Sequence, residues 1–351
     1  MDSQQETSKV NTHSERRRKH SEETKTTTSQ YFGHSKTQAD HPEKRSSKAR
    51  QALLSFTGGT LATKVPPKEF QNPTPRNDPQ RIDLRDVANE TLRLLPGLLA
   101  TRPDVENRSS LGQGKDLEID PNYCPNLPRT KIRVINSDTI DAALDLSSTS
   151  HSNVPVCILN LANAETPGGG FRHGAMAQEE ALCYRSSLYL TLKRKYYPIP
   201  DKAAIYSPSI LIVRENASTH ELLDFRDPSQ LPVLSVVGAA AICQPELVRS
   251  RSTGRPTYKH GEDRALTAEK MRVILRSTIR RRHRQIILGA MGCGAFGNPN
   301  DEVAALWSRV LQEPEFSGGW WKDVVFAVFD TQPAPGSNYQ VFFDQLDGLS
   351  V

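Results

Sequence analysis

The stretch Thr166-Pro-Gly-Gly-Gly-Phe-Arg-His-Gly-Ala-Met-Ala-Gln-Glu-Glu180 joins two kinds of residue that an active site for an anionic ligand needs. Three consecutive glycines come first. Because glycine has no Cβ and tolerates positive φ, its backbone can approach a bulky ligand closely. Two adjacent glutamates follow, and carboxyl groups supply acid and base chemistry. The stretch therefore predicts a site that holds an anion and moves a proton.

Short apolar runs alternate with longer helical patterns on both sides of this stretch, which predicts an α/β fold with a mixed, largely parallel sheet between two layers of helices. A helix over Arg81–Leu95, ended by Pro96-Gly97, is expected to pack on the outside. The predicted strands are 131–135, 154–159, 203–213, 233–237, 285–288 and 324–329, and the predicted helices are 138–146, 179–192, 266–282 and 301–311.

A second glycine-rich segment, Gly289–Asn298, follows the predicted strand 285–288. Ligands of α/β sheets bind outside the carboxyl ends of the strands, and exposed backbone N–H groups in such a loop can bind an anion. Two facing loops of this kind could hold a diphosphate, although a tight turn explains either loop taken alone. Phe296 fits either a core anchor or a ring stacked on a sugar.

The positive charge of the chain belongs to its first 76 residues. They hold 14 of the 45 Lys and Arg residues but only 8 of the 40 Asp and Glu residues, so the remainder is close to neutral. Few aromatic residues and no periodicity predict that residues 1–76 are disordered. Arg16–His20 fits either a nuclear-import signal or a solvated charged tail. The near-neutral remainder argues against nucleic-acid binding by the folded domain.

No apolar run approaches the length of a membrane span, and the first residues lack the apolar core of a secretory signal. The five cysteines are widely spaced and predict reduced thiols rather than disulfides or a zinc site. We therefore expect an intracellular protein, in the nucleus or the cytoplasm, that does not bind a membrane, a metal or a cofactor. The polar segment 244–263 has no assigned role at this point.

Pro167–Gly170, followed after seven residues by Gln178–Glu180, resembles the signature of poly(ADP-ribose) glycohydrolases, and the surrounding sequence resembles the microbial type found in bacteria and fungi. The resemblance covers about residues 80–345. It implies a macrodomain with an added N-terminal helix, poly(ADP-ribose) and ADP-ribosylated proteins as partners, and a link to the DNA damage response. We expect a monomer. Matching segments are 134–139, 160–164, 177–182, 204–208, 292–298 and 326–330.

The resemblance also implies roles for individual residues. Glu180 corresponds to the catalytic acid and Glu179 to a neighbour that contacts the terminal ribose. Asn163 corresponds to a residue that binds ribose hydroxyls, and Asp138 is placed on the adenosine side. The remaining expected ligand-binding residues are Gly168, Gly169 and Gly170 in the diphosphate loop, Gln178 beside the glutamates, and Gly292, Gly294, Ala295, Phe296 and Gly297 in the opposing loop.

The adjacency of the two glutamates bears on the mechanism. Successive helical residues point about 100° apart, so Glu179 and Glu180 are not expected to flank one sugar from opposite faces. We infer that Glu180 both protonates the leaving hydroxyl and activates the water. Burial and a second carboxyl raise a glutamate's pKa, and a helix N-terminus lowers it. A non-catalytic ADP-ribose reader and a hydrolase of mono-ADP-ribosyl groups remain alternatives.

Overall fold

The computed structural model describes residues 82–150 and 152–351. The predicted tail over 1–76, its basic cluster Arg16–His20 and the predicted domain start at residue 80 lie outside the described residues. The first described helix, α1, runs over Leu84–Ala100, and the last, α7, runs over Asn338–Leu346.

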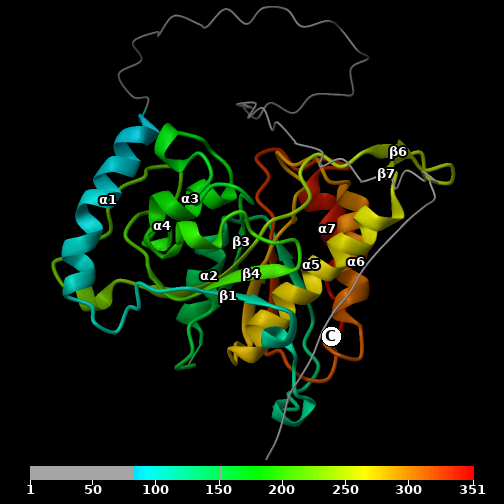
Figure 1. Cartoon of the computed structure of the whole chain (residues 1–351), viewed down its shortest axis with the longest axis horizontal. Helices are drawn as coiled ribbons and strands as arrows, with labels where there is room; N and C mark the ends of the chain where they lie inside the picture. Colours follow the sequence, from blue (N-terminus) through cyan, green and yellow to red (C-terminus); the bar gives the residue numbers. More distant parts are fainter. Residues whose placement is uncertain (1–81, 151) are drawn as a thin grey trace, which may run out of the picture. The chain divides into compact units, whose positions relative to one another are not determined.

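A seven-stranded sheet forms the centre of the domain (Figure 1). Four pairs of neighbouring strands run parallel, whereas β1–β4 and β4–β5 run antiparallel. The predicted mixed, largely parallel sheet is therefore confirmed. Its strands lie in the order β1 (Ser110–Gln113), β4 (Ala203–Leu211), β5 (Val233–Ala239), β3 (Cys157–Leu161), β8 (Gln285–Leu288), β9 (Asp323–Ala327) and β2 (Arg133–Ile135).

Helices cover both faces of this sheet. Side chains alternate between the faces along a strand: in β3, Cys157 and Leu159 belong to one hydrophobic core and Ile158 belongs to the other. The first core is completed by α5 (Gly261–Arg280), α6 (Asn300–Leu311) and α7, and the second by α1, α2 (Thr139–Ser148), α3 (Gln178–Arg185) and α4 (Leu188–Thr191) (Figure 1). The three-layer α/β/α arrangement is confirmed.

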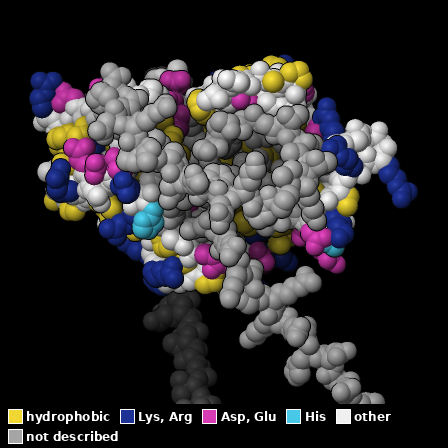
Figure 2. Space-filling model, turned by 90° about the horizontal axis from the view of Figure 1, so that it is seen from above, with side chains coloured by type: hydrophobic (Ala, Val, Ile, Leu, Met, Phe, Trp, Pro, Cys, Tyr) yellow, Lys and Arg dark blue, Asp and Glu magenta, His cyan; other side chains and the backbone are white. Residues whose placement is uncertain are grey.

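Charged side chains of both signs are interspersed at the surface. In the view of Figure 2, the visible Lys and Arg side chains are scattered around the rim, with Asp and Glu side chains among them. Residues 77–351 contain 31 Lys and Arg and 32 Asp and Glu residues, so this part of the chain is close to neutral in composition.

Helix α1 runs through Pro96 to Ala100, so its predicted end at Pro96-Gly97 is wrong. A proline inside a helix removes one hydrogen bond and costs about 3 kcal/mol. Leu95 and Leu98, however, are buried against side chains of β4 and of the segments after it. Each such burial contributes about 1.5–3 kcal/mol, so packing of the last turn outweighs the cost of the proline.

The predicted helix over 179–192 is two helices, α3 and α4. The carbonyl of Arg185 accepts hydrogen bonds from the N–H groups of Val213 and Arg214. These bonds come from the segment after β4 and take the place of a bond from the next helical turn, and the chain turns at Ser186-Ser187. Tertiary hydrogen bonding thus ends α3 where the local pattern continues.

Several elements were not predicted. β1 is an edge strand within residues 103–130, and α7 packs in the same hydrophobic core as α5 and α6. Within the polar segment 244–263, β6 (Leu247–Arg249) and β7 (Pro256–Tyr258) form an antiparallel ribbon separate from the main sheet. Short 3₁₀ helices lie at Gly114–Leu117, Pro121–Tyr123, Phe171–His173, Arg194–Tyr196 and Pro228–Gln230.

Candidate active site

Two glycine-rich loops leave the sheet at neighbouring strands. β3 and β8 pair in parallel, with Cys157 opposite Ile286, so the residues after each strand emerge at the same edge of the sheet. We call residues 163–170 the first glycine loop and residues 289–298 the second glycine loop. The expectation that both loops lie at the carboxyl ends of strands of one sheet is confirmed.

The first glycine loop wraps around the carboxylate of Glu180. Gly170 N donates to Oε1 at 2.8 Å, and Ala177 N, just before α3, donates to Oε2 at 3.2 Å. Gly169 has φ +53°, and a Cβ added there would lie 2.3 Å from Glu180 Oε1. Only glycine allows the backbone to lie so close to this carboxylate, so these glycines shape the surroundings of Glu180.

Glu179 is buried deeper in the same place, with 2% of its surface exposed compared with 7% for Glu180. Asn160 Nδ2 donates to its Oε1 at 3.0 Å, and Asn163 N donates to its Oε2 at 2.8 Å. Burial raises the pKa of the Glu179 carboxyl to about 8 against the opposing effect of these hydrogen bonds, and the charge of Glu180 adds to the rise. Burial thus favours the protonated form of Glu179.

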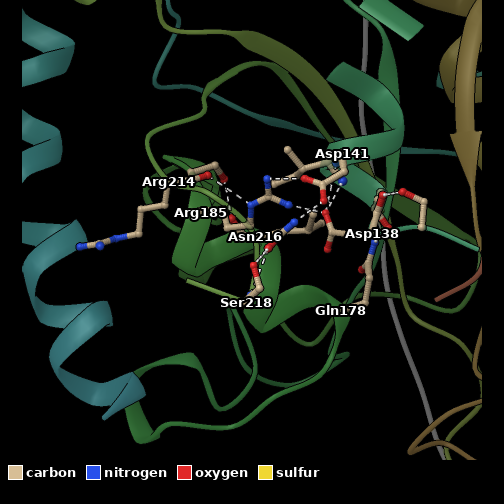
Figure 3. A network of polar contacts seen from close by, with 12 residues as sticks. Asp138, Asp141, Gln178, Arg185, Arg214, Asn216 and Ser218 are labelled. Atoms are coloured by element: carbon tan, nitrogen blue, oxygen red, sulfur yellow. Dashed lines mark hydrogen bonds and ion pairs between the residues drawn. The ribbon is translucent and has the colours of Figure 1, made fainter. Parts of the chain in front are cut away.

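Helix α3, which carries both glutamates, is held at both ends (Figure 3). At its start, the Gln178 amide accepts from Leu161 N at 2.8 Å and donates to Leu159 O at 2.7 Å, so it is bonded to the backbone of β3. At its end, the buried Arg185 guanidinium forms ion pairs with Asp138 and Asp141 at the start of α2. These contacts fix the helix relative to both β3 and α2.

The second glycine loop differs because its backbone donors are open. Gly294 and Ala295 are exposed and Phe296 is half-buried. Within the described residues, the N–H groups of these three residues have no hydrogen-bond acceptor. Gly292 and Gly297 have φ values of +75° and +67°. Consecutive open N–H groups form an anion-binding concavity.

The predicted site residues therefore divide into groups. Asn163, Gly169 and Gly170 contact the buried pair Glu179 and Glu180, and Gly168 lies beside them in the same loop. Gln178 is bonded to β3, and Asp138 caps α2 and pairs with Arg185. Gly292, Gly294, Ala295, Phe296 and Gly297 lie at the same sheet edge, and in residues 82–150 and 152–351 no hydrogen bond joins them to the glutamates.

Comparison with known proteins agrees with this geometry. Residues 114–215 match the family described as microbial-type PARG, catalytic domain. The crystal structure of poly(ADP-ribose) glycohydrolase (PARG) from Thermomonospora curvata is similar at 26% sequence identity and a TM-score of 0.60, over 75% of this chain and 98% of that chain. The resemblance to the microbial-type poly(ADP-ribose) glycohydrolases is confirmed.

Two ligand-bound PARG structures are also similar to this chain. The T. curvata enzyme bound to the inhibitor ADP-HPD is 27% identical with a TM-score of 0.60, over 75% of this chain and 99% of that chain. The Deinococcus radiodurans enzyme in complex with ADP-ribose is 28% identical with a TM-score of 0.57, over 72% of this chain and 97% of that chain. Among curated protein sequences, none matches the chain. The family match and these structures support a glycohydrolase enzyme.

The PARG-like domain also contains residues near the two loops that were not predicted to belong to the site. Asn160 is fully buried and donates to Glu179. The only available signal was a polar residue inside the apolar run that leads into the first loop. Phe329, 69% exposed, follows β9 at the same edge as the second loop. The described residues of the PARG-like domain include no helix long and apolar enough to cross a membrane.

Proposed function

We propose that this chain hydrolyses the ribose–ribose O-glycosidic bonds of poly(ADP-ribose) and releases ADP-ribose. The observation that carries the proposal is the buried pair Glu179-Glu180, held by a glycine loop beside a second loop with open N–H donors. The family match and the similarity to PARG structures support the same activity.

Glu180 is the proposed general acid and base. Cleavage passes through an oxocarbenium-like transition state, which requires protonation of the leaving oxygen and attack by water. Glu180 is the more exposed of the two glutamates, and its carboxylate lies against the backbone of the first loop. In our mechanism Glu180 enters the reaction with a proton and gives it to the glycosidic oxygen, so that the C–O bond breaks and the departing ribose leaves with a hydroxyl group. As a carboxylate it then takes a proton from the attacking water.

Glu179 is proposed to position the terminal ribose. With a pKa raised to about 8, its carboxyl is neutral near pH 7 and can donate a hydrogen bond to a ribose hydroxyl. A neutral Glu179 also avoids a second negative charge beside a substrate that already carries a diphosphate. Asn163 N donates to Glu179 and its side chain accepts from the backbone of the first loop, which leaves its Nδ2 for a ribose hydroxyl.

The rest of ADP-ribose is proposed to extend along the sheet edge. The open N–H groups of Gly294, Ala295 and Phe296 suit the diphosphate. The exposed ring of Phe329 suits the adenine, and Asp138 lies on the same side of the domain, where α2 begins. The T. curvata complex with ADP-HPD and the D. radiodurans complex with ADP-ribose support a ligand of this class.

We propose the corresponding biology for the whole chain. Its partners would be poly(ADP-ribose) and ADP-ribosylated proteins, which it would process as a monomer in the nucleus or the cytoplasm, in response to DNA damage. The near-neutral composition of residues 77–351 supports our proposal that the folded domain does not bind nucleic acid.

The test is to incubate the full chain with poly(ADP-ribose) and, separately, with a mono-ADP-ribosylated protein, and to identify the products by mass spectrometry. We expect free ADP-ribose from the polymer. Tight binding of ADP-ribose with an intact polymer would instead identify a non-catalytic reader. Release from the mono-modified protein alone would identify a mono-ADP-ribosyl hydrolase.

A further inference from the structure

The β6–β7 ribbon is bound to the start of α6. Tyr258 N, at the end of β7, donates to Glu302 Oε2 at 3.1 Å, and Arg255 forms an ion pair with Asp301. Arg264, at the start of α5, forms an ion pair with the same Glu302. The ribbon therefore has a fixed place beside the helix that follows the second glycine loop.

A buried chain of hydrogen bonds runs from this ribbon into the second glycine loop. Thr267 Oγ1 donates to Tyr258 Oη at 3.2 Å, and Tyr258 Oη donates to Asn298 Oδ1 at 2.8 Å. These three residues are 2%, 6% and 4% exposed, respectively. Buried polar groups need partners, and losing one partner leaves the other unsatisfied. The Tyr258 hydroxyl is thus needed to satisfy the Asn298 side chain.

Asn298 in turn closes the second glycine loop. Its Nδ2 donates to Ile242 O at 2.7 Å and to Gly292 O at 3.2 Å, and its backbone N–H donates to the same Gly292 carbonyl at 3.0 Å. Gly292 lies so close that an added Cβ would be 2.4 Å from Asn298 Nδ2. One amide therefore joins both ends of the loop and connects them to the segment after β5.

The hydrogen bonds of Asn298 fix the ends of the loop segment that carries the open N–H donors. Gly294, Ala295 and Phe296 lie between the two positions that Asn298 joins, and Gln244 N donates to Phe296 O at 2.8 Å. Their N–H groups can converge on one ligand only if the ends of the loop stay fixed. The side chain of Asn298 and the segment that leads into the ribbon supply that restraint.

We propose that Tyr258 and Asn298 are positioning residues that hold the second glycine loop in the shape that binds the diphosphate of ADP-ribose. The inference rests on the proposed function, because it concerns how that ligand is bound. It gives the segment 244–263 a role: the ribbon supplies the hydroxyl that orients Asn298. Glu179 and Glu180 are held by a separate set of contacts from β3 and the first loop.

The test compares Tyr258→Phe with Tyr206→Phe. Tyr206 is a matched control because its hydroxyl bonds to His283, away from both loops. ADP-ribose affinity is measured by calorimetry, kcat and KM are measured on poly(ADP-ribose), and unfolding is followed in denaturant. We expect Tyr258→Phe to weaken ADP-ribose binding and raise KM by about tenfold, the factor that one lost buried hydrogen bond can produce, with little change in kcat.

Asn298→Asp is the second variant. It keeps the side-chain acceptor for Tyr258 and loses the side-chain donor to Gly292 O and Ile242 O. We expect it to lose at least as much affinity for ADP-ribose as Tyr258→Phe does. If Tyr258→Phe does not fold, Thr267→Val removes the hydrogen bond on the far side of the same hydroxyl, and a smaller loss of affinity for ADP-ribose is expected.

Unchanged affinity for ADP-ribose in the folded variants, or a fall in kcat with unchanged affinity, would overturn the inference. A wild-type chain that neither binds ADP-ribose nor degrades the polymer would instead overturn the proposed function.

Discussion

The two glycine loops have similar compositions and face the same edge of the sheet, yet their backbones do different things. In the first loop, Gly170 N donates to the Glu180 carboxylate and Gly169 N donates to Thr166 O. In the second, the N–H groups of residues 294–296 have no acceptor within the part of the chain that the structure describes. One loop binds the protein's own carboxylate, and the other is open to an external anion.

This difference shows that glycine can serve two purposes in one site. A buried carboxylate is costly unless donors surround it, and the first loop supplies them at a distance that a Cβ would prevent. The expected role of Gly168, Gly169 and Gly170 at the diphosphate therefore stays a prediction. The structure supports the second loop more strongly for that task. Variants that affect one loop and leave the other intact test this division.

The largest effect is expected from Glu180→Gln. Glutamine keeps an acceptor for Gly170 N but cannot transfer the proton, so hydrolysis should fall by about 10²–10⁴-fold. Binding of ADP-ribose should persist, because the second loop is unchanged. Turnover of poly(ADP-ribose) and calorimetric binding measure the two properties. Glu165→Gln, at an exposed position of the same loop, is the control. Near-normal turnover by Glu180→Gln would refute the assignment.

A matched pair of alanine substitutions tests the comparison directly. Gly169→Ala would place a Cβ 2.3 Å from Glu180 Oε1 at φ +53°, so we expect a loss of about 1–3 kcal/mol in stability and of about a hundredfold in kcat. An added Cβ at Gly294 meets no atom within 4 Å, so Gly294→Ala should stay within about 0.5 kcal/mol of wild type. For each variant, denaturant unfolding measures the stability and turnover of poly(ADP-ribose) measures kcat. Equal effects would show that the loops do not differ as described.

The buried carboxyl beside the first loop should make stability depend on pH. Glu179 has a pKa of about 8 in the native state against 4.5 when unperturbed. Between these values the native state holds a proton that the unfolded state has lost, so wild-type stability falls by about 1.4 kcal/mol per pH unit through this group. Below 4.5 and above about 8 the two states carry the same charge, and the slope disappears.

Glu179→Gln removes that titration. Its stability relative to wild type should therefore rise from pH 5 to pH 8 and level off above pH 8, as measured by denaturant unfolding at each pH. A difference that stays constant over this range would show that the Glu179 pKa is not raised. We also expect the variant to hydrolyse the polymer more slowly, because the ribose loses a positioning group.

The smallest effect is expected from a substitution at Phe329, which lies beyond the second loop along the sheet edge. Phe329 follows β9, the strand next to β8, and its ring is 69% exposed. If the ligand extends past the open donors, Phe329→Ala should weaken ADP-ribose binding by roughly fivefold, the loss of one modest stacking contact. Phe343→Ala, at a partly exposed position on α7, is the control. Equal affinities for both variants would limit the site to the two loops.

The strands of this fold could be predicted because their signal is local. The segment 285–288 was predicted with the bounds that β8 has, since a short apolar run between polar residues needs no distant information. The end of α1 could not be predicted, because buried leucines that pack on β4 outweigh Pro96. The end of α3 depends on bonds from Val213 and Arg214, which lie in the segment after β4.

The site shows the same division between local and distant information. The glutamates and both glycine loops were predicted from composition and order along the chain. Asn160 and Tyr258 were not singled out from the sequence, because the residues that they contact, Glu179 and Asn298, come close to them only through folding. The sequence pattern also cannot distinguish a glycine that accommodates Glu180 from one that leaves its N–H open, since only the position of the carboxylate separates the two cases.

β3 lies in the middle of the sheet, and both its neighbours, β5 and β8, come much later in the chain. Asn160 and Gln178 connect the glutamates to β3, and during synthesis β3 lacks one of its two neighbouring strands until β8 has left the ribosome. Pairings so distant in sequence also form slowly. The acidic pair is therefore among the last features to be assembled, and a nascent chain that ends before residue 285 should be catalytically inert although it already carries every glutamate of the site.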